Sequence, residues 1–406
     1  MAPSAVSILD ELGVAAEKYM QDYQFMHLAG MDGKPLKTYH LHDIQVKVGD
    51  TKRNFGFAGR SNLQQALLEQ IMANKSASEQ EDEILHCGVS VTGYENQENH
   101  VKVFLSDGSS IKASALLACD GIHSKIRQHM HRNNVAGDDL NYCGQEVWWG
   151  KVTLEKQGNS ELDQELQRLN EKVGNTKGEN LALALISTPK HPGGFFSCER
   201  DNTHAWVYFV KGNKKEANAN QTNDLTRRGG SVLTEADKKR ELTDVMANGH
   251  KLMQLIIEST PAADITRAGL FDRANLDLPF VDGRVALLGD AAHPQSPMQG
   301  QGANMAIVDG FVATSRLAAA NMTHVSQTLQ EYDTQSRRAG INKVIKEARY
   351  YGKLMSSKSP FKCWALKTIT KYAPSKVVLS QMTKADKPNQ EFIQAMEADI
   401  GKVWSG

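Results

Sequence analysis

The spacing of apolar residues predicts a mixture of helices and strands in the first third of the chain. Residues 4–20 have apolar side chains at helical intervals, and the segment NLQQALLEQIMAN is expected to form a second helix with Ser61 as its N-cap. Short alternating runs after residue 84 predict strands, and Asp107-Gly108 between two of them predicts a hairpin turn. The apolar run Leu116–Cys119 predicts a buried strand, which a helix then follows.

The pattern changes near residue 142, where segments rich in β-branched and aromatic residues begin. They predict a separate sheet with long loops, because polar inserts interrupt them at 155–180 and 211–240. Helical spacing returns in KKRELTDVMANGHKLMQLIIEST, and residues 325–406 are expected to form helices with a basic, exposed face. Between these two regions, the sequence predicts a buried strand at Val285–Leu288 and a long helix from about Ala303 to Ala320.

Composition narrows the range of partners. Lys+Arg and Asp+Glu both number 47, so the sequence has no basic excess of the kind that nucleic-acid-binding proteins show. Five dispersed cysteines without a CxxC spacing argue against a disulfide framework and a zinc site, and they favour a reducing compartment, the cytoplasm. No apolar run approaches the roughly 20 residues of a transmembrane helix. Phe361–Val378 mixes Lys with Trp, Leu and Ile, so attachment to a membrane surface is an alternative to the favoured packing on its own domain.

The strongest chemical signal is the segment GRVALLGDAAHPQSPMQGQGANMAIVDG at 283–310. Gly289 allows a sharp turn after the buried strand, which leaves Asp290 at the carboxyl end, where open α/β sheets bind ligands. A carboxylate at this place can accept hydrogen bonds from a polyol. The loop then leads into the helix at Ala303, whose unpaired N–H groups and dipole face the same cleft. Taken alone, Gly300-Gln301-Gly302 is weak evidence for a cofactor site, because a strand–loop–helix connection whose glycines only turn the chain would contain the same residues.

Two shorter segments precede this one. Asp120-Gly121 ends the strand Leu116–Cys119, and by itself such a pair often marks only a turn and a helix start. Gly59-Arg60 opens the helix near Ser61, where an arginine can also be an ordinary surface residue.

In this order, with Asp120 about 170 residues before Asp290, the three segments resemble the aromatic-hydroxylase class of FAD-dependent monooxygenases. The resemblance covers residues 4–340 and implies that Asp290 and Arg60 hold the flavin and that Asp120 serves the cofactor path. The helix that starts at Ala303 is implied to stabilise the reduced ring. The cofactor-binding residues implied in this way are Arg60, Asp120, Asp290, Gly302, Ala303 and Asn304.

The same resemblance implies the activity and the fold. NADPH or NADH reduces FAD, and one oxygen atom of O₂ is inserted into an aromatic or polyketide-like small molecule, an activity of secondary metabolism. The fold class is α/β, with a Rossmann-like FAD/NAD(P)-binding domain interleaved with a β-sheet substrate domain and followed by C-terminal helices. The expected boundaries are 1–140 and 266–340 for the FAD-binding domain, 141–265 for the substrate domain and 341–406 for the C-terminal helices.

One part of the family pattern is missing from the sequence. Family members begin with a strand, a GxGxxG turn and a helix that together hold the FAD pyrophosphate. No GxGxxG occurs here, and Ser4–Tyr19 already resembles the helix that follows such a turn. We expect either a gene model that starts too late or a remnant that acts, without cofactor, as a binding or accessory protein.

The substrate side is less defined. Its candidate pocket residues, each of which could instead belong to the core of the middle sheet, are Trp148, Trp149, Phe195, Phe196, Trp206 and Tyr208. His191 and Arg200 are weaker candidates for orienting a phenolate. Many relatives have an arginine where Trp149 stands, so no catalytic base is assigned. A halogenase or an ene-reductase on the same scaffold is a further alternative, although the halogenase motif WxWxIP does not match Trp148–Val152.

Overall fold

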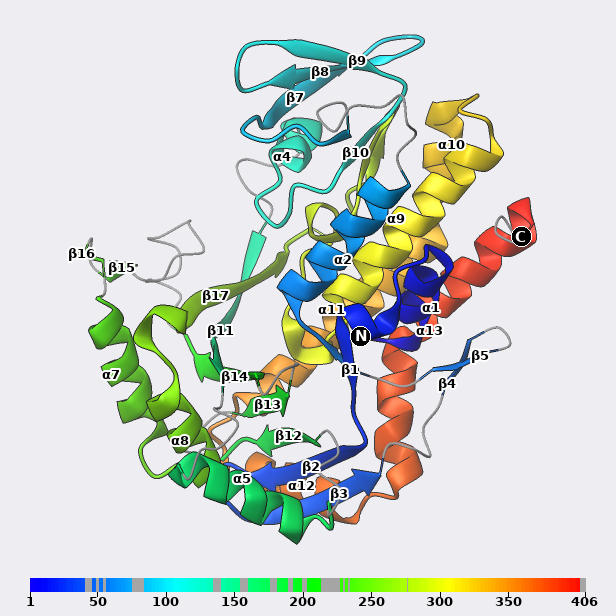
Figure 1. The fold of residues 1–406 in the computed structure, drawn as a ribbon. Helices are drawn as coiled ribbons and strands as arrows, with labels where there is room; N and C mark the ends of the chain where they lie inside the picture. Colours follow the sequence, from blue (N-terminus) through cyan, green and yellow to red (C-terminus); the bar gives the residue numbers. More distant parts are fainter. Residues whose placement is uncertain are drawn as a thin grey trace.

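The computed structural model describes residues 1–40, 46–48, 51–53, 56–74, 84–133, 140–153, 160–175, 181–188, 193–198, 203–212, 227–228, 231–232, 234–275 and 277–401. Figure 1 shows a large sheet at the lower end of the molecule, a smaller set of strands at the upper end, and long helices beside both. The mixture of helices and mixed sheets confirms the predicted α/β class.

The large sheet contains seven strands: β2 (Phe25–Gly30), β3 (Pro35–His40), β11 (Leu140–Thr153), β12 (Leu181–Ile186), β13 (Gly194–Cys198), β14 (Thr203–Lys211) and β17 (Thr266–Arg273). Their order is β17-β11-β14-β13-β12-β2-β3, and β12 and β2 are the parallel neighbours. The sheet predicted within 141–265 thus also contains strands from both flanking regions. β2 pairs with β12, which would otherwise be an edge strand of the sheet.

Helices cover one face of this sheet: α5 (Glu161–Lys172), α7 (Glu235–Met246) and α8 (Lys251–Ser259). The helical spacing near residues 238–260 predicted this region, but the chain forms two helices there. Asn248, with φ of 62°, lies in the turn between them. Two short elements lie close to this region in the sequence, the strand pair β15 (Arg227–Arg228) and β16 (Ser231–Val232) and the turn η3 (Ala262–Asp264).

A small sheet contains both predicted buried strands. Its members are β10 (Leu116–Ala118), β19 (Val285–Leu287) and β18 (Val281–Asp282). β10 and β19 run parallel, with Ala118 opposite Leu287, so their carboxyl ends lie at the same edge. All three residues of β19 are completely buried.

A three-stranded meander and a short helix lie beside the small sheet in Figure 1. The elements are β7 (Val91–Asn96), β8 (Val101–Leu105), β9 (Ser110–Ala113) and α4 (Lys125–His131). The turn between β8 and β9 contains Asp107 and Gly108, which has φ of 88°, as the sequence predicted. Asp107 accepts a hydrogen bond from the backbone of Ser109 at 2.9 Å.

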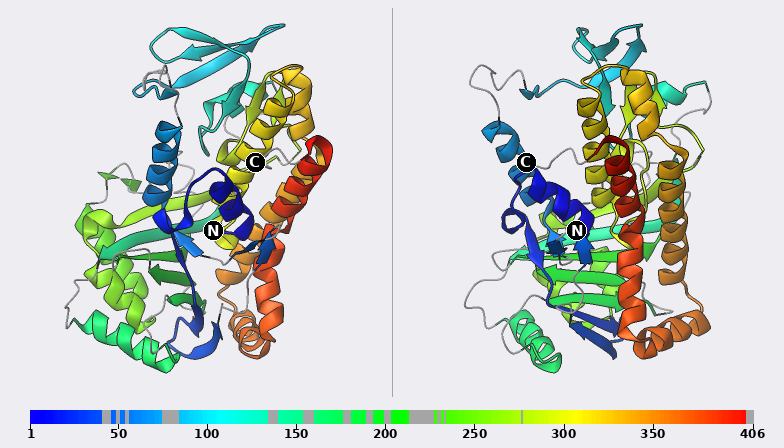
Figure 2. Two further views of the ribbon diagram at one scale, coloured as in Figure 1. Left: turned by 45° about the vertical axis from the view of Figure 1, so that its right-hand side comes forward. Right: turned by 90° about the vertical axis from the view of Figure 1, so that its right-hand side faces the viewer.

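The C-terminal part of the described chain is helical, as predicted. Two short turns, η4 (Gly289–Ala291) and η5 (Pro297–Gln299), lead into α9 (Gly302–Ala319), α10 (Val325–Tyr332), α11 (Gln335–Met355), α12 (Pro360–Tyr372) and α13 (Ser375–Ile400). Figure 2 shows α11 and α13 running along one side of the molecule, and the two helices contact each other. The long helix α9 lies in the core, where Val308, Val312 and Ala313 are completely buried.

The N-terminal elements differ from the prediction in their limits. They are α1 (Pro3–Glu11), η1 (Ala16–Lys18), β1 (Met20–Asp22), β4 (Val46–Val48), β5 (Thr51–Arg53), β6 (Gly56–Ala58) and α2 (Arg60–Ala73). The helix expected over 4–20 ends at Glu11, because Gly13 with φ of 77° breaks it. The second helix begins at Arg60 with Gly59 as its N-cap, so the prediction of Ser61 as the cap was wrong.

Candidate functional site

The parallel strands β10 and β19 bring Asp120 and Asp290 to neighbouring loops. Each aspartate follows its strand within three residues, and the register of the two strands puts both at the carboxyl edge of the small sheet. Arg127 joins the loops from behind: its buried guanidinium donates to the carbonyls of Ile122 at 2.5 Å and Ala291 at 2.9 Å. The two motifs found in the sequence therefore form one structural unit.

Gly289 gives Asp290 its position. Its φ is 56°, a backbone conformation that favours glycine, and a Cβ there would lie 2.9 Å from the Cβ of Ala306. Both the backbone conformation and the lack of space therefore require glycine at this position. Asp290 itself is exposed, yet burial by the surrounding protein raises the pKa of its carboxyl, while the charges of His293, Arg127 and Arg60 lower it. Asp290 is thus open to solvent on one side and surrounded by protein on the other, and we call the space between Asp290 and the start of α9 the recess. Arg60, at the start of α2, is close enough for its positive charge to lower this pKa.

The start of α9 borders this recess. Gly302 opens the helix, and a Cβ on Gly302 would lie 4.0 Å from Oδ1 of Asp290. Ala303 is exposed beside it. The nitrogen of Met305 bonds to the carbonyl of Gln301 at 2.9 Å, so by helix geometry the N–H groups of Gly302, Ala303 and Asn304 precede the helical bonds. These backbone groups and the helix dipole favour negative charge in the recess.

The side chain of Asn304 faces the other way. It is buried, donates to the carbonyl of Gly300 at 2.9 Å and accepts from the backbone nitrogen of Ala2 at 2.8 Å. The side chain of Asn304 thus stabilises the loop before α9. Its backbone N–H is the group that could contact the cofactor, and this contact remains a prediction.

This recess suits the flavin half of FAD. The carboxylate of Asp290 can accept hydrogen bonds from ribityl hydroxyls. It lies beside the start of α9, with its N–H groups, and within the range of the positive charge of Arg60. The role of each residue toward FAD remains a prediction, but the geometry gathers Arg60, Asp290 and the helix start, with Asp120 on the adjacent loop.

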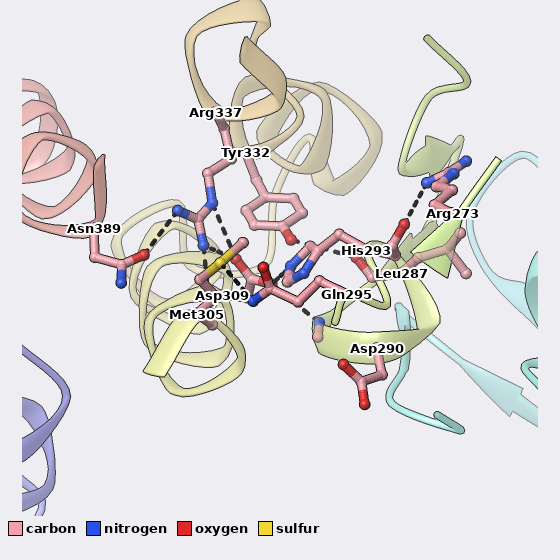
Figure 3. Close-up of polar contacts among 12 residues, drawn as sticks. Arg273, Leu287, Asp290, His293, Gln295, Met305, Asp309, Tyr332, Arg337 and Asn389 are labelled. Atoms are coloured by element: carbon pink, nitrogen blue, oxygen red, sulfur yellow. Dashed lines mark hydrogen bonds and ion pairs between the residues drawn. The ribbon is translucent and has the colours of Figure 1, made fainter. Parts of the chain in front are cut away.

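A buried polar network lies behind the recess (Figure 3). The carboxylate of Asp309 in α9 accepts from the nitrogen of Gly289 at 3.0 Å, from Nε2 of His293 at 2.5 Å and from Nε of Arg337 at 3.1 Å. Arg337 also donates to Oδ1 of Asn389 in α13 at 3.2 Å. Burial raises the pKa of Asp309, but Arg337 and His293 more than offset this, so its pKa is about 2.

The sequence analysis did not identify this network. Tyr332 packs beside it, and the Tyr332 hydroxyl donates to the carbonyl of Leu287 at 3.3 Å. Arg337, in contrast, is one half of a completely buried ion pair. A signal for it existed in NMAIVDGFVA, where Asp309 is the single charged residue of an apolar helical run and so requires a buried partner.

A pocket of about 510 Å³ opens next to the recess. Ile122, from the loop of Asp120, and Gln295, from the loop of Asp290, form part of its wall. Its other lining residues come from β11, α7, η3 and β17: Val147, Trp149, Lys238, Ala263, Ile265, Thr266, Arg267, Ala268, Gly269, Leu270 and Phe271. Oε1 of Gln295 is buried without a hydrogen-bond partner among the described residues.

The six aromatic residues predicted to line the substrate pocket lie on both faces of the large sheet. Trp149 is 37% exposed and lines the pocket. On the opposite face, the buried side chains of Trp148, Phe196, Trp206 and Tyr208 belong to the core under the helices. Phe195 contacts Tyr23 instead, with ring centroids 6.3 Å apart. His191 and Arg200 lie outside the described residues.

Comparisons with known proteins identify the family of the chain. A family model described as the FAD binding domain matches residues 2–348. The chain is 27% identical over 241 residues to 6-hydroxynicotinate 3-monooxygenase of Bordetella bronchiseptica, which covers 57% of this chain and 51% of that protein. It is 24% identical over 351 residues to 2-heptyl-3-hydroxy-4(1H)-quinolone synthase of Pseudomonas aeruginosa, covering 86% of this chain and 78% of that one. The chain spans between 51% and 60% of the length of the first three curated relatives.

Solved structures share the fold. Klebsiella pneumoniae HpxO, in complex with FAD and uric acid, matches with a TM-score of 0.73 and 18% identity over 96% of this chain and 86% of that one. A salicylate hydroxylase in complex with its substrate matches with a TM-score of 0.64 and 16% identity, over 96% and 89% of the two chains. Because the family match extends over most of the sequence, the protein belongs to the FAD binding domain family, which confirms the prediction of this family and of FAD as its cofactor.

Proposed function

We propose that this protein is an FAD-dependent monooxygenase that inserts one oxygen atom of O₂ into an aromatic or polyketide-like small molecule, with NADPH or NADH as reductant. The observation that carries the proposal is the common wall of the pocket and the recess. Ile122 and Gln295 line the pocket, and they belong to the loops of Asp120 and Asp290. A substrate in the pocket would therefore lie against the flavin.

When bound, FAD would accept electrons from the nicotinamide and pass them to O₂, which is chemistry that protein side chains do not supply. The chain's own residues would position the flavin and shield the reacting atoms from water. Asp290 would accept hydrogen bonds from the ribityl hydroxyls, and Arg60 with the start of α9 would favour negative charge on the ring. The pocket walls, from Val147 to Phe271, would exclude water from the reacting atoms.

The pocket also supports a substrate class. Its volume lies in the usual range for small-molecule sites, and its lining is largely apolar, with Trp149 and Phe271 as aromatic walls. Lys238, half-buried at the wall, adds a positive charge that suits a carboxylate or a phenolate. Two relatives are named for hydroxylated nitrogen heterocycles, a pyridine carboxylate and a quinolone. We include both ring types in the proposed class.

The test is an isotope experiment. The protein is supplied with FAD, NADPH or NADH and a panel of 6-hydroxynicotinate, a 2-alkyl-4-quinolone and salicylate, under ¹⁸O₂. We expect FAD-dependent oxidation of one nicotinamide and a product with one labelled oxygen. A protein that binds a panel member but oxidises no nicotinamide at saturating FAD would instead be a binding protein, and an unlabelled product would exclude monooxygenation.

The proposed site of action is a reducing compartment such as the cytoplasm. The cysteines Cys87, Cys119, Cys143 and Cys363 are free thiols in the structure, which supports this part of the proposal.

A further inference from the structure

The helix α12 has two distinct faces. On its inner face Cys363 and Thr370 are buried, and Leu366 packs against a cluster that includes Tyr39 of β3. Lys367 forms an ion pair with Asp32 at 2.8 Å. The helix is therefore fixed to the lower end of the molecule, beside β3 (Figures 1 and 2).

The outer face of α12 is apolar and exposed. Phe361 is 71% exposed, Trp364 62%, Ile369 64% and Tyr372 72%. At 100° per residue these four side chains occupy an arc of about 140° on the side away from Cys363 and Thr370. The rings of Phe361 and Trp364 lie 5.9 Å apart and form one continuous surface. Contiguous exposed apolar side chains of this size mark an interaction surface.

The positive charge around the apolar face of α12 indicates an anionic partner. Lys362 and Lys371 border the apolar arc on its two sides, and both are exposed. Residues 348–385 contain eight Lys and Arg and no Asp or Glu, although the whole chain has zero net charge. Lys37 of β3 reaches the end of α12, where it donates to the carbonyl of Ala373. The apolar face is thus framed by positive charge that no acidic residue of this segment neutralises.

We propose that the outer face of α12, defined by Phe361, Trp364, Ile369 and Tyr372 with Lys362 and Lys371, docks on an anionic lipid bilayer. Aromatic side chains with flanking lysines are the composition of helices that lie in the membrane interface, and anionic headgroups supply the counter-charge. A second copy of the chain is disfavoured, because two such faces would bring their lysines together. No helix in the described residues is long and apolar enough to cross a membrane, so α12 would lie in the plane of the bilayer.

Vesicle binding by the full chain tests the proposal. We expect the protein to sediment with vesicles of phosphatidylcholine and phosphatidylserine, much less with phosphatidylcholine alone, and less at high salt. The variant Phe361→Ser/Trp364→Ser/Tyr372→Ser and the variant Lys362→Glu/Lys371→Glu should each lower the partition coefficient about tenfold or more. A matched control, Ile111→Ser/Met322→Ser, removes two exposed apolar residues elsewhere and should bind as the parent does.

Trp364 offers a second readout on the unmodified chain. Its fluorescence should shift to shorter wavelength on the anionic vesicles, and most of this shift should be lost in Trp364→Phe. Trp148 and Trp206 are already buried, and Trp149 lies on β11, five strands away from β3 in the large sheet. Equal binding to both kinds of vesicle, no binding, or unchanged binding of the folded α12 variants would overturn the proposal. So would a parent dimer that the α12 variants convert to a monomer, since that result assigns the face to a second copy.

Discussion

The backbone nitrogen of Gly289 donates to Oδ2 of Asp309 over 3.0 Å, and this bond ties the residue before Asp290 to the middle of α9. The same oxygen accepts from His293, four residues further along the loop, at 2.5 Å. Because Asp309 is completely buried and held in addition by Arg337, the turn that presents Asp290 is fixed from behind. The recess therefore depends on a network that does not itself face a ligand.

Gly289→Ala should destabilise the protein by about 1–3 kcal/mol, the cost of forcing a side chain into the left-handed region. The new Cβ would also lie 2.9 Å from that of Ala306. Gly310→Ala, on the helix that Gly289 contacts, is the matched control: it meets no atom within 4 Å and should stabilise by about 0.5–1 kcal/mol. Chemical denaturation measures both, and equal effects of the two substitutions would contradict this account of the turn.

Asp309→Asn should cost about 3 kcal/mol of unfolding free energy, because it leaves the buried guanidinium of Arg337 without its counter-charge. Arg337→Met should cost a similar amount, and the double variant should lose less than the sum of both. Lys251→Met, which removes an exposed ion pair with Glu161, serves as control and should cost less than about 1 kcal/mol. Additive losses at Asp309 and Arg337 would rule out the coupling.

The same carboxyl predicts a pH dependence. Its pKa is depressed from 3.8 to about 2, so its contribution to stability is complete above pH 3.8 and is lost as the pH falls toward 2. The loss should amount to about 2 kcal/mol, since each pKa unit corresponds to about 1.4 kcal/mol. Asp309→Asn should lack this part of the acid transition, which denaturation at a series of acidic pH values would show.

The sequence predicted the local features of the site but not the contacts that connect them. The strands before Asp120 and Asp290 and the helix α9 were all identified, because uniformly apolar runs and glycine-rich turns are local signals. The pairing of Asp309 with Arg337 joins residues 28 positions apart on different helices, and no local pattern specifies the partner. The start of α2 at Arg60 was missed for a similar reason, because Gly59 and Ser61 are both acceptable N-caps by residue type.

The aromatic residues of β11 also show that the sequence predicts local geometry but not tertiary contacts. Strand alternation requires that Trp148 and Trp149 point to opposite faces of β11, and the sequence allows this conclusion. Which face meets helices and which meets the pocket depends on where α7 and α8 pack, which is a tertiary property. The structure puts Trp148 under the helices and Trp149 at the pocket.

Asp290→Asn should have opposite effects on flavin binding and on stability. Burial raises the pKa of Asp290 above 3.8, although nearby His293, Arg127 and Arg60 lower it. For a raised pKa, the stability contribution is complete below the usual pKa and is lost as the pH rises through the shifted one. The carboxylate therefore costs stability near neutral pH, and Asp290→Asn should raise the melting temperature of the ligand-free protein.

Flavin affinity should fall in the same variant by about 1–3 kcal/mol, because a charge-assisted hydrogen bond is lost. Fluorescence titration with FAD, and separately with riboflavin, measures this change. Unchanged affinity in a folded Asp290→Asn variant would remove Asp290 from the site.

Lys238→Met tests the charge at the pocket wall. If Lys238 pairs with an acidic substrate group, the variant should raise KM about tenfold for 6-hydroxynicotinate, which has a carboxylate, and leave KM for a neutral quinolone nearly unchanged. Its half-buried position on α7 should keep the stability change small. An equal rise for both substrates would mean that the residue shapes the pocket instead of supplying charge.

The neighbouring tryptophans of β11 allow the pocket to be separated from the core. Trp148 is 1% exposed and has Arg267 over its ring at 4.8 Å, so Trp148→Ala should cost about 3–5 kcal/mol, as large core truncations do. Trp149→Ala should cost much less, because the side chain is 37% exposed. It should instead weaken substrate binding by about tenfold, since it removes an aromatic wall of the pocket. Thermal unfolding and substrate titration of both variants decide the matter: a Trp149→Ala protein with parental substrate affinity would show that the reaction takes place elsewhere, whatever the fate of Trp148→Ala.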